Sequence, residues 1–105
     1  NLIQRCLNNL IDNAFKYAKK VKIIQEKFKK NILIFIEDDG PGIPVSEYEN
    51  VFKPFYKIDR GRGDSKSSVG LGLSISSDII RSHGGNIELG KSELGGLKVK
   101  ISLPV

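Results

Sequence analysis

Two asparagines lie one helical turn apart in the stretch NNLIDNAFKY, residues 8 to 17. Asparagine forms helices poorly, so its repeated use here calls for a chemical reason. At about 100° per residue, Asn9, Asn13 and Lys16 fall within an arc of roughly 60° beside the apolar stripe of the helix. An asparagine carbonyl oxygen is a suitable Mg²⁺ ligand where phosphates already supply the negative charge. This edge therefore predicts either a magnesium–phosphate site or a helix face whose asparagines simply contact water.

A second polar group, DDGPG at residues 38 to 42, follows the apolar run ILIFI at residues 32 to 36. It should lie at the carboxyl end of a strand, where functional loops gather on a rigid scaffold. A carboxylate there can accept a hydrogen bond from an exocyclic amine such as that of adenine. Gly40 and Gly42 would let the backbone approach a flat ligand closely. Taken alone, the stretch is more typical of an ordinary Asp/Gly/Pro turn.

The third group is GLGL, residues 70 to 73, between a long polar stretch and an apolar periodic one. Glycines at the start of a helix leave free N–H groups that can bind anions. The pattern is neither GxGxxG nor the GxxxxGK[ST] phosphate loop. A glycine pair of this kind can also be only a tight entry into a helix, so this group is informative only beside the other two.

Apolar periodicity predicts the elements that position these groups. We expect helices over residues 2–18 and 71–83, strands over 21–26, 32–37, 86–90 and 97–103, a hairpin connection over 27–31, a short helix over 46–52 and a long loop over 56–69. The short helix would be capped by Ser46, with Glu49 completing a capping box. Helices and strands mix without a regular alternation, which favours an α+β layer of helices on one face of a mixed or antiparallel sheet.

The second long helix carries its own expectations. Leu71, Ile75 and Ile79 recur at i+4 spacing and predict its buried stripe, with Gly84 as its stop. The serines at positions 74, 76 and 77 should lie on its surface. His83, the only histidine of the chain, sits where a cation favours the helix dipole, so we expect it to be structural.

Length and composition predict one globular domain. The chain has 105 residues, of which 39% are hydrophobic and 28% charged, ordinary values for a domain that can build a single core. Cys6 is the only cysteine, so no internal disulfide forms. No apolar run is long enough to span a bilayer. Because the chain begins within a predicted helix, we expect a domain of a larger protein whose other parts lie in a membrane.

The formal net charge is +5, and much of the excess falls in the lysines of residues 16 to 30. We interpret them as a solvated surface flanking the hairpin. A nucleic-acid patch is the alternative, but no aromatic residues alternate with the lysines as a single-strand platform requires. We therefore expect no nucleic-acid partner, and salt-dependent retardation would test that expectation.

Taken together, in this order and spacing, the three groups resemble the catalytic, ATP-binding domain of sensor histidine kinases, within the GHKL (Bergerat) family of gyrase-type, Hsp90-type and MutL-type ATPases. Residues 9–14, NLIDNA, resemble the N box, and residues 38–42 resemble the G1 box. Residues 52–56, FKPFY, resemble the F box, and residues 70–73 resemble the G2 box. The F box and the Lys-Tyr that ends the N-box helix are typical of histidine kinases. The last residues, GKSELGGLKVKISLPV, are similar to the end of the osmosensing type.

The resemblance implies a two-layer α/β sandwich: a mixed sheet covered on one face by helices, with a mobile ATP lid over about residues 56–69. It implies one domain over residues 1–105, lacking the strand and hairpin that usually precede the N box. ATP and Mg²⁺ are the implied ligands. The implied catalytic residues are Asn9, Asn13, Lys16 and Arg62. The implied nucleotide-binding residues are Asn9, Asn13, Lys16, Tyr17, Asp38, Gly40, Gly42, Ile43, Phe55, Arg62, Gly70, Leu71, Gly72 and Leu73.

Within that set, the resemblance gives particular roles to particular side chains. Asn13 would hold Mg²⁺, with Asn9 supporting the phosphate end and Lys16 touching phosphate. Tyr17 would pack against the adenine or ribose, and Asp38, rather than Asp39, would pair with the adenine amine.

The resemblance also gives roles to residues at the phosphate end of the site and in the lid. Phe52 and Phe55 would anchor the base of the lid, and Arg62 would meet the γ-phosphate. Gly70 and Gly72 would line the triphosphate. The chain departs from the common G2 pattern GxGxGL at Ser68, which stands where the first glycine usually lies.

The implied function is transfer of the γ-phosphate of ATP to a histidine in two-component signalling. The phosphoacceptor histidine is expected on a separate dimerisation domain of the same protein, with a response regulator as an indirect partner. The resemblance implies a cytoplasmic domain of a bacterial inner-membrane protein, monomeric in isolation. The alternative is a non-catalytic GHKL nucleotide-binding module that acts as a conformational switch.

Overall fold

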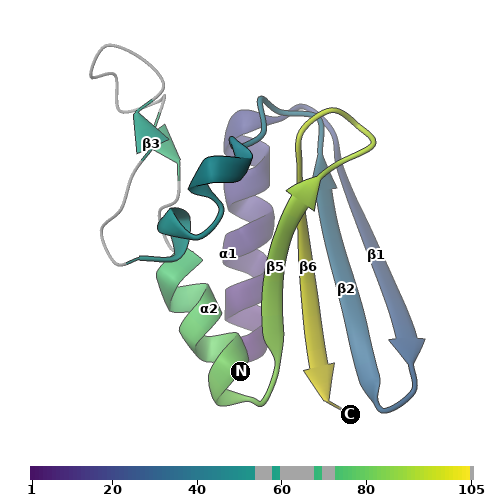
Figure 1. The fold of residues 1–105 in the computed structure, drawn as a ribbon. Helices are drawn as coiled ribbons and strands as arrows, with labels where there is room; N and C mark the ends of the chain where they lie inside the picture. Colours follow the sequence, from purple (N-terminus) through teal and green to yellow (C-terminus); the bar gives the residue numbers. More distant parts are fainter. Residues whose placement is uncertain (54–57, 60–67, 70–72, 105) are drawn as a thin grey trace.

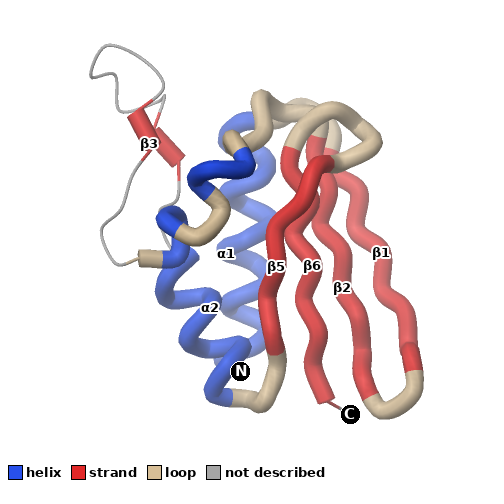
Figure 2. Tube along the Cα trace, in the orientation of Figure 1, coloured by secondary structure: helices blue, strands red, loops and turns tan. Residues whose placement is uncertain are grey.

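The computed structural model describes residues 1–53, 58–59, 68–69 and 73–104. Two helices cover one face of a four-stranded sheet whose strand order is β1-β2-β6-β5 (Figure 1). The elements are α1 (Leu2–Tyr17), β1 (Val21–Phe28), β2 (Asn31–Asp38), the 3₁₀ turns η1 (Val45–Glu47) and η2 (Asn50–Phe52), β3 (Ile58–Asp59), β4 (Ser68–Val69), α2 (Leu73–Ser82), β5 (Asn86–Lys91) and β6 (Leu97–Pro104). The layers are separate in Figure 2, and the predicted α+β sandwich is confirmed.

All described pairs in the sheet are antiparallel. The mixed sheet implied by the family resemblance would need a parallel pair, and the described strands contain none. Successive side chains of a strand point to opposite faces, so Ile34, Ile36 and Asp38 of β2 are buried on the helix side. Their partners on β6 include Ile101 and Val99, which are buried with them. The core therefore lies between the sheet and the two helices.

Helix α1 begins at a side-chain cap. The side-chain oxygen of Asn1 accepts hydrogen bonds from the backbone N–H groups of Ile3 (2.8 Å) and Gln4 (3.3 Å). Cys6, Leu10 and Ala14 are the buried residues of the helix. The apolar spacing predicted this element to within one residue at its end, because a single stripe of the helix faces the sheet.

Helix α2 covers residues 73–82 of the predicted 71–83, and its first two predicted residues lie outside the described part of the chain. Its predicted buried face is only partly correct: Ile79 packs against the core as predicted, and Leu71 lies outside the described residues. Ile75 is 62% exposed, whereas Ser76 and Ser77 are buried with Leu73 and Ile80. Small serine side chains let α1 approach closely, and the thiol of Cys6 donates to the carbonyl oxygen of Ser76 at 3.7 Å.

The end of α2 was predicted correctly. Gly84 has a φ of 81°, which glycine adopts without steric cost. The N–H of Gly85 donates to the carbonyl oxygen of Ile80 at 2.9 Å and that of Gly84 to Arg81 at 3.0 Å, the Schellman pattern. His83 Nδ1 lies 2.8 Å from the carbonyl oxygen of Ile79. The histidine thus satisfies a helix-end carbonyl, which confirms its structural role.

Two segments differ from the sequence-based expectation. Residues 46–52 form two 3₁₀ turns instead of one helix, and no side chain caps the first, so the Ser46 capping box is wrong. Val51 is the only fully buried residue there, so the segment is anchored at one point instead of along a stripe. The hairpin connection is also shorter than predicted: the strands extend to Phe28 and Asn31, leaving two turn residues.

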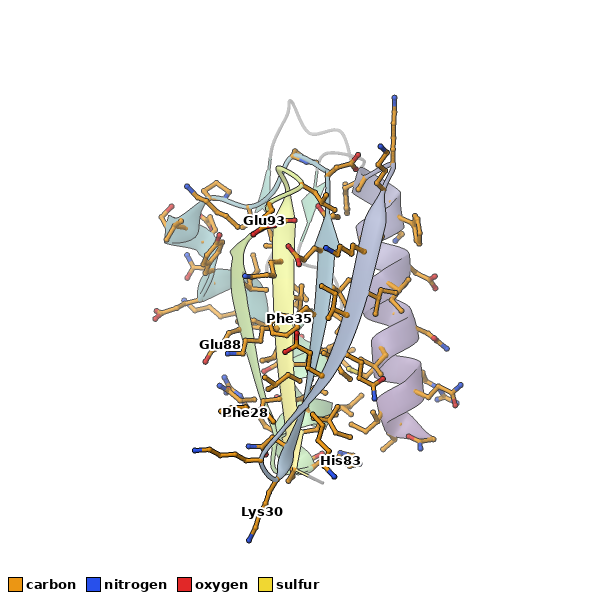
Figure 3. The ribbon with its side chains drawn as sticks, turned by 90° about the vertical axis from the view of Figure 1, so that its right-hand side faces the viewer. Phe28, Lys30, Phe35, His83, Glu88 and Glu93 are labelled. Atoms are coloured by element: carbon orange, nitrogen blue, oxygen red, sulfur yellow. The ribbon has the colours of Figure 1, made fainter. Side chains whose placement is uncertain are left out.

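The outer face of the sheet is lined by charged and apolar side chains, as Figure 3 shows around Phe35 and Glu88. Lys98 Nζ lies 6.0 Å from the centroid of the Phe35 ring. Lys30 projects from the hairpin tip beside Phe28 (Figure 3), as the solvated lysine surface predicted. Among the residues that the structure describes, neither helix has the length and apolar character needed to cross a membrane.

Candidate functional site

The carboxylate of Asp38, at the end of β2, is the centre of the candidate site. Its side chain is buried, with 7% of its surface exposed. Oδ1 accepts hydrogen bonds from the backbone N–H groups of Gly40 and Leu97, both at 3.0 Å. Both side-chain bonds go to the same oxygen, so among the described residues Oδ2 has no partner. A buried acceptor with free capacity is costly unless a ligand fills it.

The neighbouring carboxylate, Asp39, accepts hydrogen bonds from a different part of the chain. Its Oδ1 accepts hydrogen bonds from the backbone N–H groups of Lys19 (2.8 Å) and Lys20 (2.9 Å). The N–H of Asp39 donates to the carbonyl oxygen of Lys20 at 3.2 Å. The bond from Lys20 and then that from Lys19 lower the pKa of Asp39 below its ordinary value, against the opposing effect of desolvation. Asp39 thus ties the chain that leaves α1 to the end of β2.

The glycines of this turn bring three backbone segments together. A Cβ on Gly40 would lie 2.7 Å from the carbonyl oxygen of Tyr17, so only glycine lets the turn approach the end of α1 this closely. Gly42 has a φ of 71°, and its nearest neighbours are backbone atoms of Gly96, 3.6 Å from a Cβ placed on it. Ile43 then packs against the core. The turn therefore forms a backbone wall beside Asp38.

The predicted polar edge of α1 runs beside the buried residues of the helix. Asn9 and Lys16 are exposed, and Asn13 and Tyr17 are partly exposed. Tyr17 contributes its ring to the margin of the core. These four side chains thus border the core, as the arc predicted from helical spacing requires.

The start of α2 lies beside this edge. The two helices run antiparallel (Figure 1), and Cys6 contacts Ser76. Asn9 lies about one turn after Cys6 on α1. Leu73 lies about one turn before Ser76 on α2, and because the helices are antiparallel both steps go in the same direction. The structure therefore brings the asparagine edge and the beginning of α2 to the same side of the molecule.

Several predicted residues lie outside the described part of the chain. They are Phe55, Arg62, Gly70, Leu71 and Gly72. Most of the predicted lid at residues 56–69 lies outside it too, apart from two short strands. In these, Ile58 pairs with Val69 and Asp59 pairs with Ser68, so the two ends of the predicted lid meet. Phe52, at the base of the lid, packs against the core.

The loop between β5 and β6 also contacts Asp38, which the sequence did not predict. The N–H of Gly96 donates to the carbonyl oxygen of Asp38 at 3.0 Å, and a Cβ on Gly96 would collide with Asp38 Oδ1 and with the N atom of Gly40. The hydroxyl of Ser92 donates to Glu37 Oε1 at 3.0 Å. The only sequence signal is the Gly-Gly turn pair, which does not reveal that the loop meets β2.

The donor set fits a ligand that carries its own negative charge. No cluster of three histidine, cysteine, aspartate or glutamate side chains occurs in residues 1–53, 58–59, 68–69 and 73–104 that could hold a metal ion by itself. Cys6 is unsuited to such a role, because burial raises the pKa of its thiol. The asparagine amides on α1 are neutral oxygen donors, a type that can contact Mg²⁺ where phosphate oxygens supply the charge.

The whole chain, residues 1–105, matches the family model described as histidine kinase-, DNA gyrase B- and HSP90-like ATPase. Sensor histidine kinase GtrS from Pseudomonas aeruginosa is 37% identical over 103 residues, which is 97% of this chain and 21% of that protein. The catalytic domain of histidine kinase ThkA superposes with a TM-score of 0.82 at 31% identity, covering 98% of this chain and 66% of that one. The histidine kinase domain of the E. coli osmosensor EnvZ superposes with a TM-score of 0.68 at 37% identity, covering 99% and 64%.

The chain belongs to the family of histidine kinase-, DNA gyrase B- and HSP90-like ATPases. Within it, these relatives are sensor histidine kinases and their catalytic domains, as the motifs predicted. The chain spans about a fifth of the length of GtrS, 21%.

The two adjacent aspartates should respond differently to pH. In the wild type the lowered pKa of Asp39 stabilises the fold at pH values above the ordinary aspartate pKa of about 3.9. That contribution is lost as the pH falls through the lower pKa of the folded state. The Asp39→Asn variant keeps an oxygen acceptor but lacks the charge. We expect wild type to exceed Asp39→Asn in free energy of unfolding at neutral pH, with the difference shrinking below about pH 4.

Urea unfolding of both proteins at several pH values checks this expectation. The control is the Asp12→Asn variant, because the wild-type Asp12 carboxylate is exposed on α1. A difference for Asp39→Asn that stays constant down to about pH 3 would contradict the assigned hydrogen bonds.

Proposed function

We propose that this chain is the catalytic domain of a sensor histidine kinase, which binds Mg-ATP and presents the γ-phosphate to a histidine on another domain. The observation that supports it most is the carboxylate of Asp38, which is buried and held on one oxygen, while the other has no partner among the described residues. That geometry selects a ligand with an N–H donor in a fixed direction.

The 6-amino group of adenine is such a donor. Oδ1 of Asp38 takes two backbone N–H groups, leaving Oδ2 to accept from the base. A purine with an oxo group at that position would place two acceptors against each other, which loses the bond and leaves both unsatisfied. Gly40, Gly42 and Ile43 would form the wall of this end of the pocket, and Tyr17 would pack against the base or ribose.

The phosphate end of the site would lie between the asparagine edge of α1 and the start of α2. Asn13 would hold Mg²⁺, Asn9 would support it and Lys16 would contact phosphate. When bound, Mg²⁺ neutralises the charge that develops on the phosphate oxygens during transfer. Leu73, the first residue of α2, would also line the proposed pocket. The other proposed nucleotide-binding residues lie outside the described part of the chain: Phe55, Arg62, Gly70, Leu71 and Gly72.

The chain's own contribution to transfer would be positioning and charge neutralisation, as phosphoryl transfer requires. Lys16 supplies positive charge at the phosphates, and a free N-terminal turn of α2 would favour anions. The base anchor at Asp38 orients the triphosphate so that its γ end faces the partner. The proposed lid at residues 56–69 would exclude water, which otherwise competes with the histidine for the phosphoryl group.

The phosphoacceptor would belong to a separate domain of the same protein. His83 is unsuited to that role because its Nδ1 is engaged with the carbonyl oxygen of Ile79. Figure 3 also places His83 at the end of the molecule opposite Glu93, which belongs to the loop beside Asp38. The proposed partners are therefore a dimerisation and histidine-phosphotransfer domain and, through it, a response regulator. The parent protein would lie in a bacterial inner membrane with this domain in the cytoplasm.

Base recognition is tested with a pair of neighbouring substitutions. In Asp38→Asn the amide can keep an oxygen toward Gly40 and Leu97, but it places an NH₂ group where Oδ2 faces the adenine amine. A buried unsatisfied donor costs about 1–3 kcal/mol, so we expect Mg-ATP affinity to fall about 5- to 150-fold by calorimetry. Asp39→Asn is the matched control, because the Asp39 side chain accepts hydrogen bonds from the backbone of Lys19 and Lys20, just after α1. Undiminished affinity in Asp38→Asn, or equal losses in both, would refute the role of Asp38.

Histidine transfer is tested with the dimerisation domain of the parent protein added in trans. With γ-labelled ATP we expect the label to appear on the histidine of that domain, and little label on this chain alone. We expect the Asn13→Ala variant to lose this labelling. Circular dichroism is the control that its fold is intact. A chain that binds ATP but never labels the histidine domain would be the non-catalytic module instead.

A further inference from the structure

The loop that connects β5 to β6 holds Asp38 from outside its own turn. The N–H of Leu97 donates to Asp38 Oδ1 and that of Gly96 to the Asp38 carbonyl oxygen, both at 3.0 Å. One of the two donors that fix the carboxylate therefore comes from a segment almost 60 residues away along the chain, since the separation of Asp38 and Leu97 is 59. The orientation of Oδ2 depends on where this loop lies.

Within the loop, Ser92 organises the backbone. Its N–H donates to the carbonyl oxygen of Gly96 at 2.9 Å, and its carbonyl oxygen accepts from Gly95 at 3.0 Å. Its hydroxyl oxygen accepts from the N–H of Leu94 at 3.0 Å. These bonds give the loop its shape, but they do not join it to β2.

The hydroxyl of Ser92 makes that connection. It donates to Glu37 Oε1 at 3.0 Å, and the Ser92 side chain is 8% exposed. Glu37 directly precedes Asp38 on β2, and successive strand residues face opposite sides of the sheet. The loop is therefore held from both faces of the same strand end: by Glu37 on the outer face and by Asp38 on the inner face. A hydrogen bond to a charged acceptor is stronger than one between neutral groups.

We infer that Ser92 and Glu37 are positioning residues for base recognition: their hydrogen bond fixes the loop so that Leu97 and Gly96 orient Asp38 toward an amino purine. The inference rests on the proposed function, since it concerns the selectivity of the proposed nucleotide site. If the bond is removed, the loop loses its tie to the outer face, Asp38 gains freedom, and the preference for adenine over hypoxanthine declines.

The test compares ATP with inosine triphosphate, whose base carries an oxo group where adenine has its amine. A typical hydrogen bond corresponds to about a fivefold change in an equilibrium. We expect Ser92→Ala to reduce the ratio of ATP to inosine triphosphate affinity about fivefold. Ser92→Thr, which retains the hydroxyl, and Glu37→Gln, which retains an acceptor oxygen, should keep most of the ratio. Glu88→Gln on β5, an exposed carboxylate, is the control and should leave it unchanged.

A second readout does not depend on nucleotide. In Ser92→Ala and in Glu37→Ala, amide hydrogen exchange at Gly96 and Leu97 should accelerate, while exchange in the middle of β6 stays as in the wild type. The double variant should match either single variant, because both remove the same bond. This readout also remains informative if one of the substitutions weakens the fold as a whole, since exchange would then accelerate throughout β6.

The outcomes separate this inference from the proposed function. If wild type shows no preference for ATP, the proposed function fails and the inference fails with it. If wild type prefers ATP and Asp38→Asn abolishes that preference, but Ser92→Ala lowers both affinities by the same factor, only the inference is overturned. Unchanged exchange at Gly96 and Leu97 in Ser92→Ala would overturn it as well.

Discussion

The carboxylate of Asp38 is the point on which the arrangement of the site depends. A buried carboxylate is tolerated only where hydrogen-bond donors surround it, and here the donors are the N–H groups of Gly40 and Leu97. Their convergence requires the end of β2, the turn after it and the start of β6 to meet at one place. The absence of a side chain at Gly40 and Gly96 permits this meeting. The part of the candidate site around Asp38 is therefore built almost wholly from backbone that the sheet fixes.

Three successive carboxylates at the end of β2 accept hydrogen bonds from three different segments of the chain. Glu37 faces outward and bonds to the hydroxyl of Ser92, Asp38 faces the helices, and Asp39 accepts from the backbone that follows α1. Each carboxylate fixes a different neighbour, and of the three only Asp38 is buried. The same few residues thus join the helix that would contact phosphate to the sheet that would recognise the base.

The fold was largely predictable because its elements bury regular stripes. The apolar spacing of α1 and the alternation in β2 and β6 placed these elements nearly correctly. The buried face of α2 was only partly predictable. Ile79 packs against the core as predicted, but Ile75 is exposed. Ser76 and Ser77 were expected on the surface and are buried. Small polar residues can lie in a tight helix interface, and composition alone does not reveal that.

The site was predictable only where its residues are local in sequence. Helical spacing alone places Asn9, Asn13 and Lys16 together, and the resemblance to the histidine kinase family distinguished Asp38 from Asp39. The contacts of Gly96, Leu97 and Ser92 are long-range, so they depend on the pairing of β2 with β6 and leave no local pattern.

The most direct measurement of the central claim is a nuclear magnetic resonance titration of the ¹⁵N-labelled chain with Mg²⁺ and a non-hydrolysable ATP analogue. If Asp38 anchors the base, the amide resonances of Gly40, Gly96 and Leu97 should shift on binding. Those of Lys29 and Lys30 at the hairpin tip should not. Saturable shifts confined to the hairpin lysines, with Gly40 and Leu97 unmoved, would contradict the account.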